Sequence, residues 1–269
     1  AAAEGAAVAC CGVRHFDADV EEGEDDDQED NQGGGRVQLN LRQALSATGG
    51  RVWDSSVVMA ALIGEGAVRL PLPPAGGSVC ELGAGLGVLG LAAAQLLRGR
   101  GVKTVLTDYD TEVVRCLMSN IDLNFRSYED VERPSAALLD WRDFAGPSAL
   151  PDAELAERYQ GHLGAYDCVI AADVVYQRSH ATLCRVVDAL LKPEPTGEGE
   201  PPQAFLLLPD SRPALQEFVD CAQGAAEGAM RVGCRRVDQR CRLMRGLRRA
   251  RPGLGSGNSF SLYTLARAA

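Results

Sequence analysis

Long hydrophobic runs are absent from the 269-residue sequence. No apolar stretch approaches the ~18 residues that a membrane-spanning helix needs, so we expect no membrane span. The first residues, AAAEGAAVACCGVRHF, lack the layout of a signal peptide and the Arg/Ser richness of a transit peptide, and there is no initiator Met.

Metal-binding and disulfide patterns are also missing. The nine cysteines are scattered, their number is odd, and none forms C-x-x-C. The three histidines, His15, His162 and His180, do not pair with a cysteine or carboxylate at ligand spacing, so we expect no metal site. Free thiols within apolar stretches are typical of a reducing compartment. We therefore expect a cytoplasmic protein, and the same cysteine usage is compatible with the nucleus or an organelle.

The charge is unevenly distributed. The net charge of -10 argues against a general nucleic-acid binder, which needs excess Lys and Arg. Residues 17–30 form a dense acidic run without a basic residue, whereas residues 231–251 are rich in arginine. Acidic blocks of this kind are usually disordered, with an interaction tail as the alternative. We predict a disordered tail over residues 1–35 and one folded domain over residues 36–269.

Strand and helix patterns alternate along this domain. Residues 36–43 alternate apolar and polar residues like an edge strand or hairpin arm, and a helix capped around Asp54 or Ser55 follows. Further strands are predicted at SVCEL, KTVLT, SAALL, YDCVIAA, AFLLL, residues ~230–237 and SFSLYTLA, with helices after SVCEL, KTVLT, YDCVIAA and AFLLL. The last two strands are joined by the Gly-rich RPGLGSGN without a helix, which predicts a terminal antiparallel hairpin. The fold class is therefore α/β, a doubly wound, mostly parallel seven-stranded sheet.

The glycines of VCELGAGLGVLG, residues 79–90, can be counted in two ways. From Gly83 they read G-x-G-x-G, which suits a methyl-donor site, and from Gly85 they read G-x-G-x-x-G, the dinucleotide fingerprint. Asp108 ends the next strand and can accept ribose hydroxyls with either cofactor. Glu81 just before the turn favours the cationic S-adenosylmethionine, because a pyrophosphate would be repelled there. A tight turn without any ligand is the remaining interpretation.

Several motifs occur in a familiar order: GGRVWDSSVVMA, CELGAGLGVLGLAAA, VLTDYD, NIDLN, LDW and IAADVVY. Together they resemble the class I, seven-strand methyltransferases of protein methyltransferase family 16, the lysine methyltransferase-like group. The resemblance covers roughly residues 36–269. The segment from Phe144 to Tyr166, the acidic run and the arginine-rich segment match nothing in the family's pattern.

The resemblance implies roles for particular residues. Residues expected to bind S-adenosylmethionine are Trp53, Gly83, Ala84, Gly85, Asp108, Trp141 and Ala172. Asp173 and Tyr176 match the family's D-x-x-Y, which lies next to the methyl-accepting group. Taken alone, either tryptophan could be a core residue and Asp173 a helix cap.

The resemblance implies an S-adenosylmethionine-dependent methyltransferase whose acceptor is a lysine side chain of a protein. Alternatives are methylation of another nucleophile, such as a histidine, an N-terminal amine or a small molecule, or a non-catalytic S-adenosylmethionine-binding module. We expect a protein substrate, no membrane and no nucleic-acid partner, and a monomer.

Overall fold

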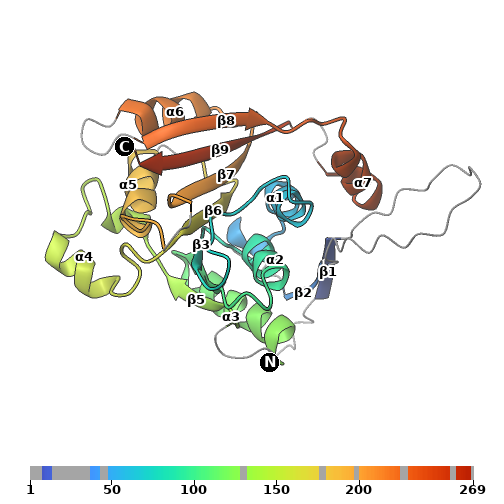
Figure 1. Cartoon of the computed structure of the whole chain (residues 1–269), viewed down its shortest axis with the longest axis horizontal. Helices are drawn as coiled ribbons and strands as arrows, with labels where there is room; N and C mark the ends of the chain where they lie inside the picture. Colours follow the sequence, from blue (N-terminus) through green and yellow to red (C-terminus); the bar gives the residue numbers. More distant parts are fainter. Residues whose placement is uncertain are drawn as a thin grey trace, which may run out of the picture.

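The computed structural model describes residues 8–13, 37–42, 48–127, 132–175, 180–196, 200–224, 230–254 and 259–267. Its centre is a seven-stranded sheet in the order β5-β4-β3-β6-β7-β9-β8 (Figure 1). The strands of this sheet are β3 (Ser78–Leu82), β4 (Lys103–Asp108), β5 (Ser135–Leu138), β6 (Cys168–Ala172), β7 (Gln203–Pro209), β8 (Met230–Arg236) and β9 (Phe260–Arg267). The predicted doubly wound seven-stranded sheet is confirmed.

Helices cover both faces of the sheet (Figure 1). They are α1 (Asp54–Gly64), α2 (Val88–Leu96), α3 (Thr111–Phe125), α4 (Asp152–Arg158), α5 (His180–Leu190), α6 (Leu215–Gly224) and α7 (Arg242–Ala250), with short 3-10 turns at Thr48–Gly50 and Trp141–Asp143. The buried strand β3 shows the two layers directly. Val79 packs in the core with α1, α2 and α3, whereas its neighbours Cys80 and Leu82 pack in the core with α5 and α6. Successive side chains of a strand point to opposite faces, so a strand that is buried at every position, as β3 is, requires both layers.

The order of strands creates a switch point between β3 and β6. From β3 the chain winds outward through β4 to β5, and it then returns to place β6 on the other side of β3. All these neighbours are parallel, so their carboxyl ends meet at one edge of the sheet. Ligands of doubly wound folds bind outside this edge. The fold therefore assigns the site to the segments that follow β3, β4 and β6.

The predicted terminal hairpin is half correct. β9 pairs antiparallel with both β7 and β8, as one antiparallel strand in the sheet requires. The connection is wrong, because helix α7 lies between β8 and β9. Its buried residues are only Met244, Gly246 and Leu247, surrounded by arginines. The apolar residues Met244 and Leu247 have helical spacing, but the arginines around them make the segment look like a charged connection.

A two-stranded sheet precedes α1. Strand β2 (Val37–Arg42) pairs antiparallel with β1 (Val8–Val13), which confirms the predicted hairpin arm. Residues 8–13 thus form a strand, in contrast to the disorder predicted for residues 1–35. The other tail residues lie outside the described ranges, so the domain boundary at residue 36 stays a prediction.

The paired asparagines of α3 attach β2 to the domain. Asn124 exchanges two hydrogen bonds of 2.8 Å with the backbone N–H and C=O of Asn40. Asn120 accepts a 2.7 Å bond from the N–H of Arg42 and donates to the carbonyl of Leu86, beside the glycine turn. These side-chain amides pair with backbone groups of β2 in addition to the pairing of β2 with β1. They also explain why NIDLN needs its two asparagines four residues apart, on one face of the helix.

In the part of the chain that the structure describes, no helix is long and apolar enough to cross a membrane.

Candidate active site

A cavity of about 370 Å³ opens at the carboxyl ends of β3, β4 and β6. Its volume is in the range of small-molecule sites. Every predicted site residue that the structure describes lines it: Trp53, Gly83, Ala84, Gly85, Asp108, Trp141, Ala172 and Asp173. Tyr176 lies outside the described residues. The tertiary structure therefore brings together side chains that are up to 120 positions apart in the chain.

The two glycine spacings meet different structural requirements. Gly83, Gly85 and Gly87 adopt φ angles of 60°, 55° and 84°, in the left-handed region where a Cβ is strained. Gly90 instead needs space, because a Cβ there would lie 2.4 Å from Oε2 of Glu81. The first spacing thus shapes the turn, and the last glycine lets α2 approach the sheet closely.

Glu81 is a buried carboxyl group at the base of this turn. Only 2% of the residue is exposed, and its Oε2 accepts a 2.9 Å hydrogen bond from the N–H of Gly90. Burial raises the pKa of Glu81 to about 8, and the nearby charge of Asp108 adds to the rise, against the lowering by the Gly90 amide. A cation beside Glu81 would favour its ionised form.

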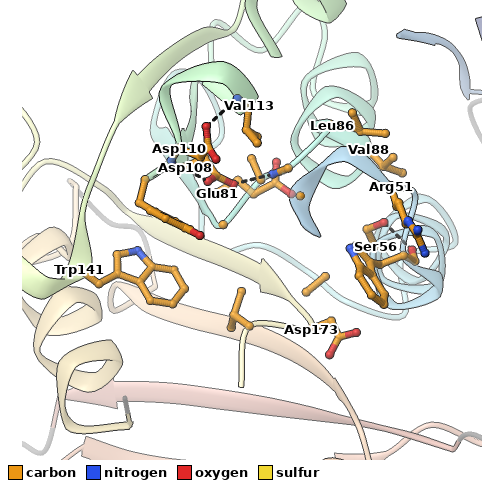
Figure 2. A pocket seen from close by; sticks show the side chains of 18 of the residues that line it. Arg51, Ser56, Glu81, Leu86, Val88, Asp108, Asp110, Val113, Trp141 and Asp173 are labelled. Carbon is orange, nitrogen blue, oxygen red and sulfur yellow. Dashed lines mark hydrogen bonds between the residues drawn. The ribbon is translucent and has the colours of Figure 1, made fainter. Parts of the chain in front are cut away.

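Asp108 is held by backbone amides from two elements. Its Oδ2 accepts from the N–H of Gly85 at 3.1 Å, and its Oδ1 accepts from the N–H of Asp110 at 3.2 Å. Burial raises the pKa of Asp108, and these amide bonds oppose that rise. An ionised carboxylate has about four acceptor positions, so lone pairs remain for hydroxyls in the cavity. Figure 2 shows Asp108 and Glu81 on the same side of the cavity, which we call the cofactor end because Asp108 is predicted from the sequence to bind the cofactor.

The two tryptophans form walls of different kinds. Trp53 is 39% exposed and stands at the rim. It occupies the N-cap position of α1 without a side-chain cap bond, so the cap predicted at Asp54 or Ser55 is wrong. Trp141 faces the turn, since its Cζ2 would lie 3.6 Å from a Cβ on Gly83.

Asp173 lies across the cavity from the cofactor end (Figure 2). Among the described residues it is the only non-glycine with a positive φ, 57°. Both carboxylate oxygens are engaged by Arg212, whose Nε and Nη2 donate at 2.7 and 2.6 Å. The Asp173 side chain is 7% exposed and that of Arg212 31%. We call this bidentate pair the acceptor end, after the role that is predicted from the sequence for Asp173.

Sequence reasoning missed Arg212. It belongs to the loop between β7 and α6 and lies 39 positions after Asp173. The two meet because β6 and β7 are parallel neighbours, so the loops that follow them are adjacent. The only available signal was that a charged residue, Arg212, follows the end of a parallel strand.

Comparison with known proteins assigns the family. The family model described as lysine methyltransferase matches residues 36–197, more than half of the chain. The chain belongs to the lysine methyltransferase family. Membership confirms the predicted resemblance, and it confirms S-adenosylmethionine rather than NAD as the cofactor. The site fits that cofactor, with two buried carboxyl groups, a glycine turn that leaves room for a ligand, and aromatic walls.

Individual relatives match over part of their length. Human "Protein-lysine N-methyltransferase EEF2KMT" and human "Putative protein N-methyltransferase FAM86B1" are each 31% identical over 153 residues, covering 53% of this chain and 41% of theirs. This chain thus spans less than half the length of these relatives. Among solved structures, a putative SAM-dependent methyltransferase from Streptococcus mutans aligns with a TM-score of 0.49 at 15% identity, over 86% of this chain and 52% of that one. A phosphoethanolamine N-methyltransferase from Haemonchus contortus aligns at 0.48 and 12%, over 77% and 40%.

Replacing Asp108 with alanine should weaken S-adenosylmethionine binding tenfold or more. A hydrogen bond to a charged group contributes about 1.5 to 3 kcal/mol, and the ribose would lose its charged acceptor. The same change leaves the amides of Gly85 and Asp110 without this partner, so Asp108→Asn, which keeps one acceptor oxygen for them, is the closer control for turn geometry. Calorimetry on folded variants measures both. An unchanged dissociation constant for Asp108→Ala would assign the ribose to another group.

Binding of S-adenosylmethionine should tighten as the pH rises toward 8. Glu81, with a pKa of about 8, carries a proton at lower pH and must lose it to complement a cation. The affinity gain is at most about tenfold per pH unit, because one proton is released. Glu81→Gln keeps the shape without the titration, so its affinity should lose this dependence. Equal pH slopes for both proteins would show that Glu81 does not face the cation.

Proposed function

We propose that this protein transfers a methyl group from S-adenosylmethionine to a lysine side chain of a protein. The observation that carries the proposal is that one cavity contains both the cofactor end, Glu81 and Asp108, and the paired charges of the acceptor end, Asp173 and Arg212. The names of the human relatives, which describe protein methyltransferases, support a protein acceptor.

The residues of the cofactor end would bind and orient S-adenosylmethionine. Asp108 would accept ribose hydroxyls, Glu81 would face the cationic part, and Trp53 and Trp141 would enclose the ligand. S-Adenosylmethionine, when bound, supplies a methyl group activated by its sulfonium. Since displacement at that carbon needs in-line geometry, these walls contribute chiefly by positioning.

The acceptor end must receive a neutral amine, although a free lysine has a pKa of ~10.4. A lone carboxylate would stabilise the ammonium form and oppose proton loss. Arg212 balances the charge of Asp173, so the pair can orient the amine by hydrogen bonding while adding little net field. Burial in the cavity then disfavours the ammonium, and the proton leaves to water. Tyr176 is proposed to line the same end.

The test is transfer of label from radioactive S-adenosylmethionine to proteins of a cell extract. We expect a labelled band whose modified residue, located by mass spectrometry, is a lysine. Label on a histidine, an N-terminal amine or a small molecule would favour a different nucleophile. Cofactor binding without any transfer would instead identify a non-catalytic module.

A further inference from the structure

The arginine-rich segment concentrates the positive charge of the protein. Nine of the 27 Lys and Arg residues lie within residues 231–251, where Asp238 is the single acidic residue. The rest of the chain has 18 basic and 36 acidic residues. All nine are arginines, whose planar guanidinium binds carboxylates in a bidentate manner. The segment is therefore a local exception on an acidic protein.

Helix α7 turns this charge outward. Met244 and Leu247 are buried in the core shared with α1 and α2. Arg242, Arg245 and Arg249 are exposed, and their spacing of three and four places them on one face of the helix. We call these three residues the arginine face. No residue of α7 is acidic, and the ion pairs recorded for the described residues include none to the arginine face.

The same helix adjoins the rim of the cavity. Arg251, directly after α7, donates to the carbonyl of Val52 at 3.2 Å and pairs with Asp54 at 3.3 Å. These two residues flank Trp53, which lines the cavity. Figure 1 shows α7 beside α1, at the side of the molecule away from α4 and α5. The carboxyl end of α7, close to Arg249, therefore lies beside the rim of the cavity.

We propose that the arginine face docks an acidic segment of the protein substrate, beside the lysine that enters the cavity. The inference rests on the proposed function and adds the chemistry by which the substrate is recognised. Carboxylates of the substrate complement three arginines that have no acidic neighbour on their own helix. A nucleic acid fits less well, because its extended phosphate backbone would also meet the acidic remainder of the protein.

The experiment measures binding of fluorescent decaglutamate to the full chain by anisotropy, at low salt and at about 0.3 M salt. The test variant is Arg242→Gln, Arg245→Gln, Arg249→Gln, since glutamine is also a good helix former. The control variant removes the same charge from exposed arginines elsewhere, Arg115→Gln, Arg126→Gln and Arg185→Gln. Cofactor affinity of both variants reports that the fold is intact.

We expect the test variant to bind the peptide about tenfold more weakly and the control variant to change less than about twofold, with the difference shrinking at high salt. Label transfer in the extract should fall for the test variant and recover as the extract concentration is raised. Equal loss in both variants would overturn the proposal, as would tighter binding of a short DNA duplex than of decaglutamate.

The acidic run of residues 17–30 provides a further outcome. If the peptide binds only after these carboxylates are replaced by amides, the chain's own segment occupies the face and the proposal fails. The outcomes for docking and for catalysis are separable. Peptide binding does not depend on turnover, and label transfer that is equal in the test variant would leave the proposed function standing without the docking surface.

Discussion

Replacing Asp173 with asparagine should lower methyl transfer on the order of a hundredfold while changing the affinity for S-adenosylmethionine only slightly. The carboxylate is proposed to orient the acceptor amine, and loss of a positioning group reduces rate rather than cofactor binding. Asparagine is chosen because Asp173 has a φ of 57°, a left-handed conformation that asparagine tolerates better than alanine. The glycine turn and Asp108 remain in place at the cofactor end.

The measurement is the transfer rate and the cofactor dissociation constant on the same folded protein. Arg212 loses an ionic partner in this variant, so a thermal melt must accompany the kinetics. Normal turnover by Asp173→Asn would contradict the assignment of the acceptor end. A parallel loss of rate and of cofactor affinity would indicate a collapsed cavity rather than a lost acceptor contact.

Replacing Arg212 with glutamine should shift the pH–rate profile upward by about one unit or more. Without the guanidinium, Asp173 would act as an uncompensated negative charge beside the amine and would stabilise its ammonium form. The reactive neutral amine then becomes populated only at higher pH, so the rate near neutral pH should fall about tenfold. We expect the rate of the variant to keep rising at pH values at which the wild-type rate has already levelled off.

Arg212→Lys is the matched control, because it keeps the positive charge and loses only the bidentate geometry. Its profile should stay close to the wild type, with a modest loss in rate. A structural role alone would reduce stability in both variants without moving the pH profile. An unshifted profile for Arg212→Gln would therefore show that the pair does not set the charge at the acceptor end.

The cofactor end was accessible to sequence reasoning because its causes are local. Three glycines with φ between 55° and 84° are needed wherever a strand turns this sharply, whatever surrounds them. Asp108 follows from topology alone, since the carboxyl ends of neighbouring parallel strands meet at one edge. Trp53, Trp141 and Asp173 were placed by motif order rather than by physics, and all three line the cavity.

Two features of the structure are not predicted from the sequence, for different reasons. Helix α7 escapes prediction because arginines fill much of this short segment, although the apolar Leu243, Met244 and Leu247 recur at helical spacing. The raised pKa of Glu81 follows from its burial. The position of a residue in a predicted strand does not show whether it is buried. The role of Glu81 beside a cation stays a prediction, and burial raises the pKa of the carboxyl group to about 8.

The alternation of strands and helices, the glycine turn and the carboxylate that ends the next strand can be read from the amino-acid sequence, because backbone conformation and strand periodicity depend on neighbours in the chain. The folded protein alone shows that Arg212 pairs with Asp173 across 39 positions and that Arg251, directly after α7, lies beside the rim of the cavity. Such contacts depend on which loops become neighbours when the sheet forms. The ion pair at the acceptor end forms because the loops that follow β6 and β7 are adjacent.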